Sequence, residues 1–328
     1  MQNKNEYIIS EMTDIQSLEV DTLKGLSAIP KYLLSKYFYD DKGSLIFQEI
    51  TKMPEYYLTK SEQEIFEIHK EQISDAIISE NSRFDLLELG SGDGSKTKIL
   101  LKQLILKNAD FKYIPVDISS KANNDLVSEL NKEFSSLKIS PLTGDFFGLT
   151  DSGTINSITR KVILFLGSNI GNFTEPEIDI FLTQLSDFCR KGDKILIGFD
   201  LKKSPGIIMK AYDDPYGRTR EFNLNHLARL NRDLDADFNL SMFEYHATYN
   251  PVSGYLKSYL VSKEQQIVNI KSLRQGFVFN RWEPVFMELL RKFDFTTIER
   301  IAFKHRFSIV KHFTDEKNWF TDSIWVKT

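Results

Sequence analysis

The stretch that decides the fold is Glu88-Leu89-Gly90-Ser91-Gly92-Asp93-Gly94. It closes the apolar run 84–89, which predicts a buried strand, and a helical pattern begins near Ser95. Glycines here let the backbone turn sharply and approach a ligand that a Cβ atom would exclude. The apolar run 112–117 predicts the next strand and ends on Asp117, an acid placed to bind both hydroxyls of a ribose. Strand, glycine loop, helix, strand and acid together indicate a nucleoside-cofactor site.

The glycine spacing narrows the choice of cofactor. Dinucleotide enzymes carry G-x-G-x-x-G, whereas the glycines here fall at 90, 92 and 94, with Glu88 in front. This pattern resembles the first motif of methyltransferases that depend on S-adenosyl-L-methionine (SAM). A third element, Gly144-Asp145-Phe146-Phe147, follows the strand-like run 137–142. In the methyltransferases an acid and an apolar neighbour at that place flank the adenine, so the resemblance implies SAM as cofactor and S-adenosyl-L-homocysteine as product.

Composition limits the class of protein. The 328 residues suit one large domain or two smaller ones, and an apolar content of 41% is ample for a core. The net charge of −4 argues against a nucleic-acid partner. A single cysteine, Cys189, suits a reducing cytoplasm, and the polar N-terminus and the short apolar runs predict neither a signal peptide nor a membrane span. The histidines show no metal-ligand spacing, so we expect no metal site; the oligomeric state stays open.

The middle of the chain alternates strands and helices. Strands are predicted at 84–89, 112–117, 138–143, 161–166 and 194–200, and helices at 95–108, 120–135 and 175–190. This alternation predicts a parallel sheet with helical crossovers. Thr59 with Glu62 and Thr174 with Glu177 have the spacing of capping boxes, in which the acid accepts a hydrogen bond at the start of a helix.

After residue 200 the pattern changes. A helix-rich piece reaches about residue 234, strands near 242–249 and 255–262 predict a hairpin, and the end predicts a helix near 284–293 with strands near 296–302, 306–311 and 322–327. We therefore predict an α/β fold, a Rossmann-like class I SAM methyltransferase sheet with a second, smaller inserted α+β domain. Residues 62–200 with 284–328 would bind SAM, and residues 1–61 with 201–283 would form a substrate-binding or lid domain.

Several further stretches resemble the SAM-dependent histidine Nα-methyltransferases, the ergothioneine-pathway enzymes. They span roughly residues 36–240 and include Met53-Pro54-Glu55-Tyr56-Tyr57 and Gly167-Ser168-Asn169-Ile170-Gly171-Asn172-Phe173. The resemblance implies an N-methyltransferase acting on the α-amine of an amino acid. It implies that SAM is held by Tyr39, Gly90, Gly92, Lys96, Asp117, Asp145 and Phe146, and that the α-carboxylate and α-amine of the acceptor are held by Tyr56, Asn172 and Tyr212. Each acceptor residue also has a structural interpretation: Tyr56 as a packing aromatic, Asn172 as a helix cap and Tyr212 as a core residue.

One departure from the family concerns the acceptor side chain. The histidine-specific members carry Glu-x-Ser-x-Lys followed by Phe or Tyr, and the Glu and Ser recognise the imidazole. We matched this motif to Arg274-Gln275-Gly276-Phe277-Val278-Phe279, where the glutamate and serine are absent, and we predict that Arg274 and Gly276 line a changed side-chain pocket. Two alternatives follow: an enzyme of this family with an acceptor other than histidine, or a SAM-binding protein without turnover.

Overall fold

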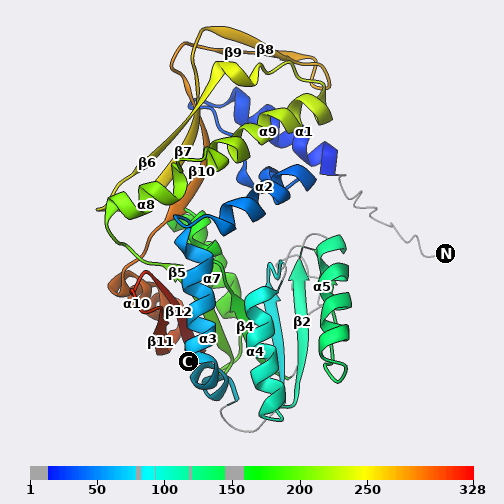
Figure 1. Cartoon of the computed structure of the whole chain (residues 1–328), viewed down its shortest axis with the longest axis vertical. Helices are drawn as coiled ribbons and strands as arrows, with labels where there is room; N and C mark the ends of the chain where they lie inside the picture. Colours follow the sequence, from blue (N-terminus) through cyan, green and yellow to red (C-terminus); the bar gives the residue numbers. More distant parts are fainter. Residues whose placement is uncertain (1–13, 79–82, 93, 118–119, 145–158) are drawn as a thin grey trace, which may run out of the picture. The chain divides into compact units, whose positions relative to one another are not determined.

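The computed structural model describes residues 14–78, 83–92, 94–117, 120–144 and 159–328 (Figure 1). The chain divides into two compact units. Unit 1 comprises Met1–Glu55, Gly206–Tyr249 and Leu256–Glu288, and unit 2 comprises Tyr56–Pro205, Asn250–Tyr255 and Leu289–Thr328. Within the described ranges every helix is too short or too polar to cross a bilayer.

Unit 2 is built on a seven-stranded sheet in the order β11-β12-β5-β4-β1-β2-β3. Strands β1 to β5 pair in parallel, whereas β12 runs antiparallel to both of its neighbours. The strands are β1 (Phe84–Leu89), β2 (Phe111–Asp117), β3 (Leu142–Thr143), β4 (Arg160–Phe165), β5 (Lys194–Asp200), β11 (Phe307–Thr314) and β12 (Phe320–Lys327). The predicted Rossmann-like α/β sheet is confirmed.

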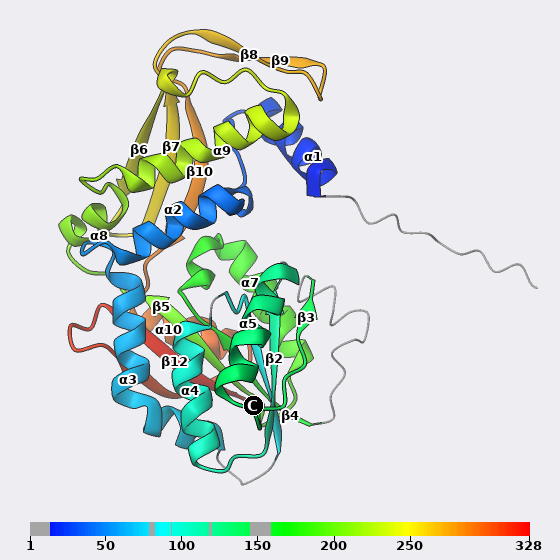
Figure 2. The same ribbon diagram turned by 45° about the vertical axis from the view of Figure 1, so that its right-hand side comes forward.

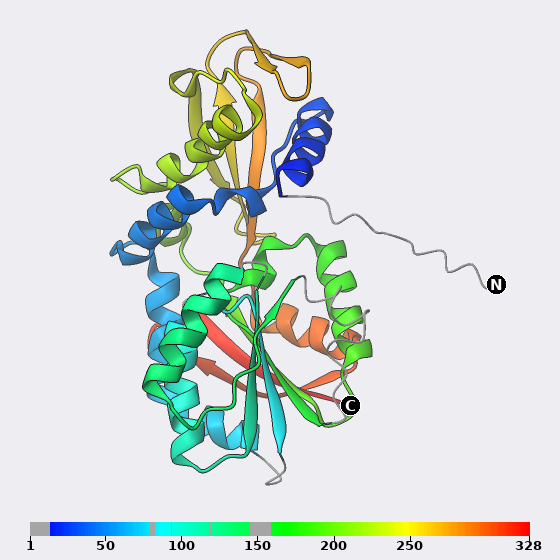
Figure 3. The ribbon, with the colours of Figure 1, turned by 90° about the vertical axis from the view of Figure 1, so that its right-hand side faces the viewer.

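Helices cover both faces of this sheet (Figure 3). One face packs against α3 (Tyr57–Ile78), α4 (Ser95–Leu106) and α5 (Ser120–Glu133), through a core that includes Ile65, Leu101 and Leu126. The other face packs against α7 (Glu175–Phe188) and α10 (Phe295–Lys304), through Leu182 and Ile301. Since both faces are covered, β1 and β5 are buried along their whole length, which agrees with their mainly apolar sequences.

Unit 1 combines helices with small antiparallel sheets (Figure 2). A three-stranded sheet has the order β10-β7-β6, and β8 pairs with β9 as a separate hairpin. Its helix α9 packs on β6, and α2 lies beside α9. The elements are α1 (Asp14–Ser27), η1 (Ser35–Phe38), α2 (Asp41–Lys52), α8 (Pro205–Tyr212), α9 (Arg218–Leu234), η3 (Leu240–Met242), β6 (Phe243–Tyr249), β7 (Tyr255–Ser262), β8 (Gln266–Ile270), β9 (Gln275–Phe279) and β10 (Pro284–Arg291), the last three residues of which belong to unit 2. The predicted 242–262 hairpin is confirmed.

The prediction for residues 284–302 is wrong, because strand and helix are exchanged. The segment predicted as a helix is strand β10, and the segment predicted as a strand is helix α10. Leu, Met and Glu favour helices, but in β10 every second residue is buried, so tertiary packing overrides local preference. In α10 the β-branched residues suggested a strand, yet Asp294 accepts a hydrogen bond from the Thr297 backbone and caps the helix, and Ile298, Ile301 and Ala302 form one buried face.

Candidate functional site

The glycine loop follows β1 at the carboxyl edge of the unit 2 sheet. Gly90, Gly92 and Gly94 all have positive φ, at 70°, 52° and 63°, a conformation that strains residues with a Cβ atom. A Cβ at Gly92 would meet nothing within 4 Å, so the backbone there borders open space. A Cβ at Gly94 would lie 2.5 Å from Leu126, so this glycine lets α4 and α5 pack closely. The loop therefore has the exposed backbone and close helix packing that a nucleotide-like ligand needs.

Asp117 ends β2 beside this loop. One of its carboxylate oxygens lies 3.4 Å from the Gly92 nitrogen, which donates a long hydrogen bond to it. The Gly90 nitrogen donates to the carbonyl of Val116 at 2.8 Å and joins the two strand ends. The structure thus brings together Gly90, Gly92 and Asp117, as the sequence predicts, and an open glycine cradle beside a half-buried acid fits a ribose-bearing cofactor.

Glu88, in front of the loop, is a structural acid. Its side chain is buried and accepts hydrogen bonds from the hydroxyls of Thr97, at 2.5 Å, and Tyr113. Burial raises the pKa of Glu88 to about 7 in spite of these hydrogen bonds. The carboxyl group therefore joins β1, α4 and β2 beneath the loop.

Lys96, in the first turn of α4, is held by an acid from a different helix. Its ammonium forms an ion pair with Glu62 of α3, and the other Glu62 oxygen accepts a hydrogen bond from the Gly167 backbone at 2.6 Å. The sequence predicted Glu62 as half of a capping box with Thr59. That prediction is wrong, because α3 begins at Tyr57 and the Glu62 carboxylate points into the protein.

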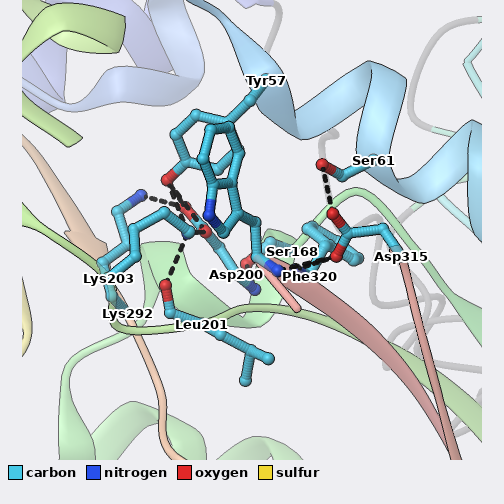
Figure 4. Close-up of polar contacts among 10 residues, drawn as sticks. Tyr57, Ser61, Ser168, Asp200, Leu201, Lys203, Lys292, Asp315 and Phe320 are labelled. Carbon is cyan, nitrogen blue, oxygen red and sulfur yellow. Dashed lines mark hydrogen bonds and ion pairs between the residues drawn. The ribbon is translucent and has the colours of Figure 1, made fainter. Parts of the chain in front are cut away.

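A third buried acid, Asp200, lies at the end of β5 and forms ion pairs with two lysines (Figure 4). Its carboxylate accepts hydrogen bonds from the Tyr57 hydroxyl at 2.9 and 3.0 Å and pairs with the ammonium groups of Lys203 at 2.5 Å and Lys292 at 2.7 Å. Burial alone would raise the pKa of Asp200, but the two lysines outweigh it and lower it. Burial lowers the pKa of Lys203 to about 8. The Asp200 nitrogen donates to the Ser168 hydroxyl at 2.9 Å, so this cluster also fixes the 167–172 segment.

The remaining sequence-predicted residues divide between the two units. Tyr56 precedes α3, and Asn172 ends η2 (Asn169–Asn172), both in unit 2. Tyr39 and Tyr212 belong to unit 1, where the Tyr39 ring packs edge-on against Phe222 and Tyr212 ends α8. Asp145 and Phe146 lie outside the residues that the structure describes.

Sequence reasoning missed Glu288, on β10. The stretch Glu288-Leu289-Leu290-Arg291-Lys292-Phe293 also fits the family's Glu-x-Ser-x-Lys-Phe motif, with leucine in place of serine, and is an alternative to the register at 274–279. Within unit 1, burial and the Glu288 carboxylate together raise the pKa of the Tyr245 hydroxyl. The Lys292-Phe293 pair, which matches the end of the motif, was the signal available in the sequence. In the structure the Lys292 side chain is buried and forms an ion pair with Asp200.

Tyr245 forms a hydrogen bond with the backbone of Tyr212, a residue predicted to bind the acceptor amino acid. Its hydroxyl donates to the carbonyl oxygen of Tyr212 at 2.8 Å. Tyr245 also lines a cavity of about 380 Å³ in unit 1, together with Asp213, Asp214, Pro215, Gly217, Arg220, Glu244 and Lys263. None of these lining residues is one that the sequence places in the site.

Arg274 and Gly276 lie on the β8–β9 hairpin of unit 1. Arg274 is exposed in the turn, with φ of 51°, and Gly276 is exposed at the start of β9. Phe277 and Phe279, further along β9, are buried. The assignment of Arg274 and Gly276 to a side-chain pocket therefore stays a prediction.

The chain is similar to known methyltransferases. A family model described as histidine-specific methyltransferase, SAM-dependent, matches residues 18–327. A histidine N-alpha-methyltransferase of Mycobacterium tuberculosis is 35% identical over 278 residues, 84% of this chain and 84% of the relative. A 4-dimethylallyltryptophan N-methyltransferase of Claviceps fusiformis is 26% identical over 310 residues, 86% of each chain. A glycopeptide N-methyltransferase solved with SAM is 10% identical, with a TM-score of 0.41 over 79% of this chain and 93% of that one.

Proposed function

Because this chain belongs to the histidine-specific, SAM-dependent methyltransferase family, we propose that it methylates the α-amine of an amino acid, with histidine as the first acceptor. The chain is a SAM-dependent methyltransferase of Rossmann-like fold. The observation that carries the proposal is that the glycine loop, Asp117 and Lys96 lie together at one edge of the sheet. The segment that ends at Asn172 lies beside them.

The cofactor residues have distinct roles in this proposal. Gly90 and Gly92 let the backbone approach the ligand, Asp117 binds the ribose hydroxyls, and Lys96 binds the amino-acid carboxylate of SAM. Tyr39, Asp145 and Phe146 complete the site, the last two beside the adenine. When bound, SAM supplies the electrophilic methyl group on its sulfonium.

The acceptor residues orient a neutral amine. Methyl transfer is an in-line displacement, so the amine must present its lone pair, and catalysis rests mainly on positioning and on removing water. Tyr56, Asn172 and Tyr212 offer hydroxyl and amide groups, which bind the carboxylate and the amine without placing a strong anion beside the amine. Such an anion would favour the protonated form, which has no lone pair to give. The reaction in this scheme uses no covalent nucleophile.

The side chain of the acceptor amino acid would be recognised by residues of β10. Glu288 and Leu290 are alternate residues of one strand and project to the same face. A carboxylate at 288 accepts a hydrogen bond from a ring N–H, whereas leucine at 290 offers no hydroxyl to the second nitrogen of an imidazole. Histidine therefore keeps one of two polar contacts, and an indole, with one N–H and an apolar ring, is the second candidate acceptor. The fungal relative named for 4-dimethylallyltryptophan supports that alternative.

The test is a mass-spectrometric screen of the purified chain with SAM and each common amino acid in turn. We expect one to three added methyl groups on histidine or on an aromatic amino acid. Leu290→Ser is expected to raise kcat/KM for histidine about tenfold, by restoring a hydrogen bond worth about 1.4 kcal/mol. The matched control is Leu106→Ser, because Leu106 is exposed on α4. If SAM binds but no amino acid is methylated, the proposal fails in favour of a binder without turnover.

Three further assignments belong to this proposal. Residues 62–200 with 284–328 bind SAM, and residues 1–61 with 201–283 supply the acceptor side of the site. A small-molecule acceptor leaves no role for nucleic acid, in keeping with the net charge of −4. The lone cysteine, which is buried, supports a cytoplasmic setting.

A further inference from the structure

Glu62 joins two functional segments that are far apart in the sequence. Its side chain is 1% exposed, one carboxylate oxygen pairs with Lys96 and the other accepts from the Gly167 nitrogen at 2.6 Å. Lys96 follows the glycine loop, and Gly167 begins the segment that ends at Asn172. A Cβ built at Gly167 would lie 3.8 Å from the Lys96 ammonium, so the two segments meet around this one carboxylate.

The sheet leaves room for this carboxylate. A Cβ at Gly198, in the middle of β5, would lie only 2.5 Å from Glu62 Oε1. Any other residue at 198 would push the carboxylate away from the Gly167 nitrogen. Opposite Gly198 on β12 stands Asp322, so the gap left by the glycine is bordered by a second acid.

Asp322 is a fully buried acid. In the described part of the chain no N–H or O–H group donates a hydrogen bond to either of its oxygens. Burial and the adjacent Glu62 carboxylate raise the pKa of Asp322 well above its usual range. A buried carboxylate without donors is costly, so these surroundings favour the protonated form of Asp322.

We propose that Glu62 is the positioning residue that couples the cofactor and acceptor halves of this site. The inference rests on the proposed function, in which Lys96 binds SAM and Asn172 binds the acceptor. Glu62 keeps Lys96 charged and directed to the sheet edge, although burial by itself favours the neutral amine. It also fixes the 167–172 segment through the Gly167 nitrogen. Loss of the charge should therefore weaken SAM binding and acceptor binding together.

The first test is Glu62→Gln in the full chain, with SAM affinity measured by titration calorimetry and acceptor kinetics measured by product mass. The amide oxygen still accepts from Gly167, but the charge opposite Lys96 is gone. We expect a rise of about tenfold or more in the SAM Kd and a rise in acceptor KM that exceeds the fall in kcat. The matched control is Glu67→Gln, an exposed glutamate one turn and a half along the same helix, with no change expected.

A second variant keeps the proposal open to refutation if Glu62→Gln does not fold. Gly198→Ala should displace the carboxylate and raise the SAM Kd in the same way. A lower melting temperature with the SAM Kd within twofold of wild type would overturn the inference. Because calorimetry needs no acceptor, it stays informative even if no amino acid is methylated.

Discussion

Replacing Asp200 by asparagine should strip two buried lysines of their counter-ion. The side chains of Lys203 and Lys292 are 4% and 1% exposed, and both ammonium groups lie within 2.7 Å of the Asp200 carboxylate. Asparagine keeps the shape and one acceptor oxygen but leaves two cations beside a neutral group. Breaking a buried ion pair from one side costs about 3–5 kcal/mol, because the remaining charge stays desolvated. We therefore expect Asp200→Asn to lower the free energy of unfolding of unit 2 by that amount.

Urea unfolding followed by tryptophan fluorescence measures this loss, since Trp325 is fully buried in unit 2 and its ring stacks on Phe199. The matched control is Asp110→Asn. Asp110 lies 3.6 Å from Lys138, but the two side chains are 61% and 65% exposed, so the change should stay below about 1 kcal/mol. A loss below about 1 kcal/mol for Asp200→Asn as well would show that the buried pairs contribute no more than surface pairs.

The pH dependence gives a second check on the same variant. The folded-state pKa of Asp200 lies below the unfolded value of 3.8, so the unfolded state binds more protons between the two values. The stabilisation is therefore complete above pH 3.8 and is lost as pH falls through the folded-state pKa. The difference between wild type and Asp200→Asn should narrow as the pH falls below about 4.

Three other perturbations test the site and its scaffold. Burial raises the pKa of Glu88 from 4.5 to about 7, so the folded state binds more protons than the unfolded state between these pH values. The free energy of unfolding should therefore fall by up to about 3 kcal/mol as the pH rises through this window. Glu88→Gln should flatten this trend in urea midpoints, and an unchanged slope would contradict the assignment. Asp117→Ala should raise the SAM Kd about tenfold in calorimetry, whereas Asp125→Ala, at an exposed position on α5, should not. Glu177→Ala should cost about 1 kcal/mol in urea unfolding, because the Glu177 side chain accepts from the Thr174 nitrogen at the start of α7; an unshifted midpoint would rule out that role.

The parallel strands of the unit 2 sheet could be predicted from the sequence because they are buried on both faces. The predicted strands 84–89 and 194–200 match β1 and β5 residue for residue. Where burial is partial the signal weakens: the run 138–143 forms only the two-residue strand β3 and an isolated bridge at Ile139. The exchange of strand and helix in 284–302 has the same origin, since only pairing with β7 makes the alternation in β10 visible.

The sequence by itself determined the glycine loop and its acid, because the spacing of Gly90, Gly92 and Asp117 expresses a local backbone requirement and a strand end. The sequence pattern assigned Glu62 to a helix cap, because Thr59, three residues earlier, has the spacing of a capping box. Only the tertiary structure placed Glu62 beside Lys96 and Gly167, 34 and 105 residues away. Sheet order and burial decide such pairings, because a buried carboxylate must find its donors wherever the fold brings them.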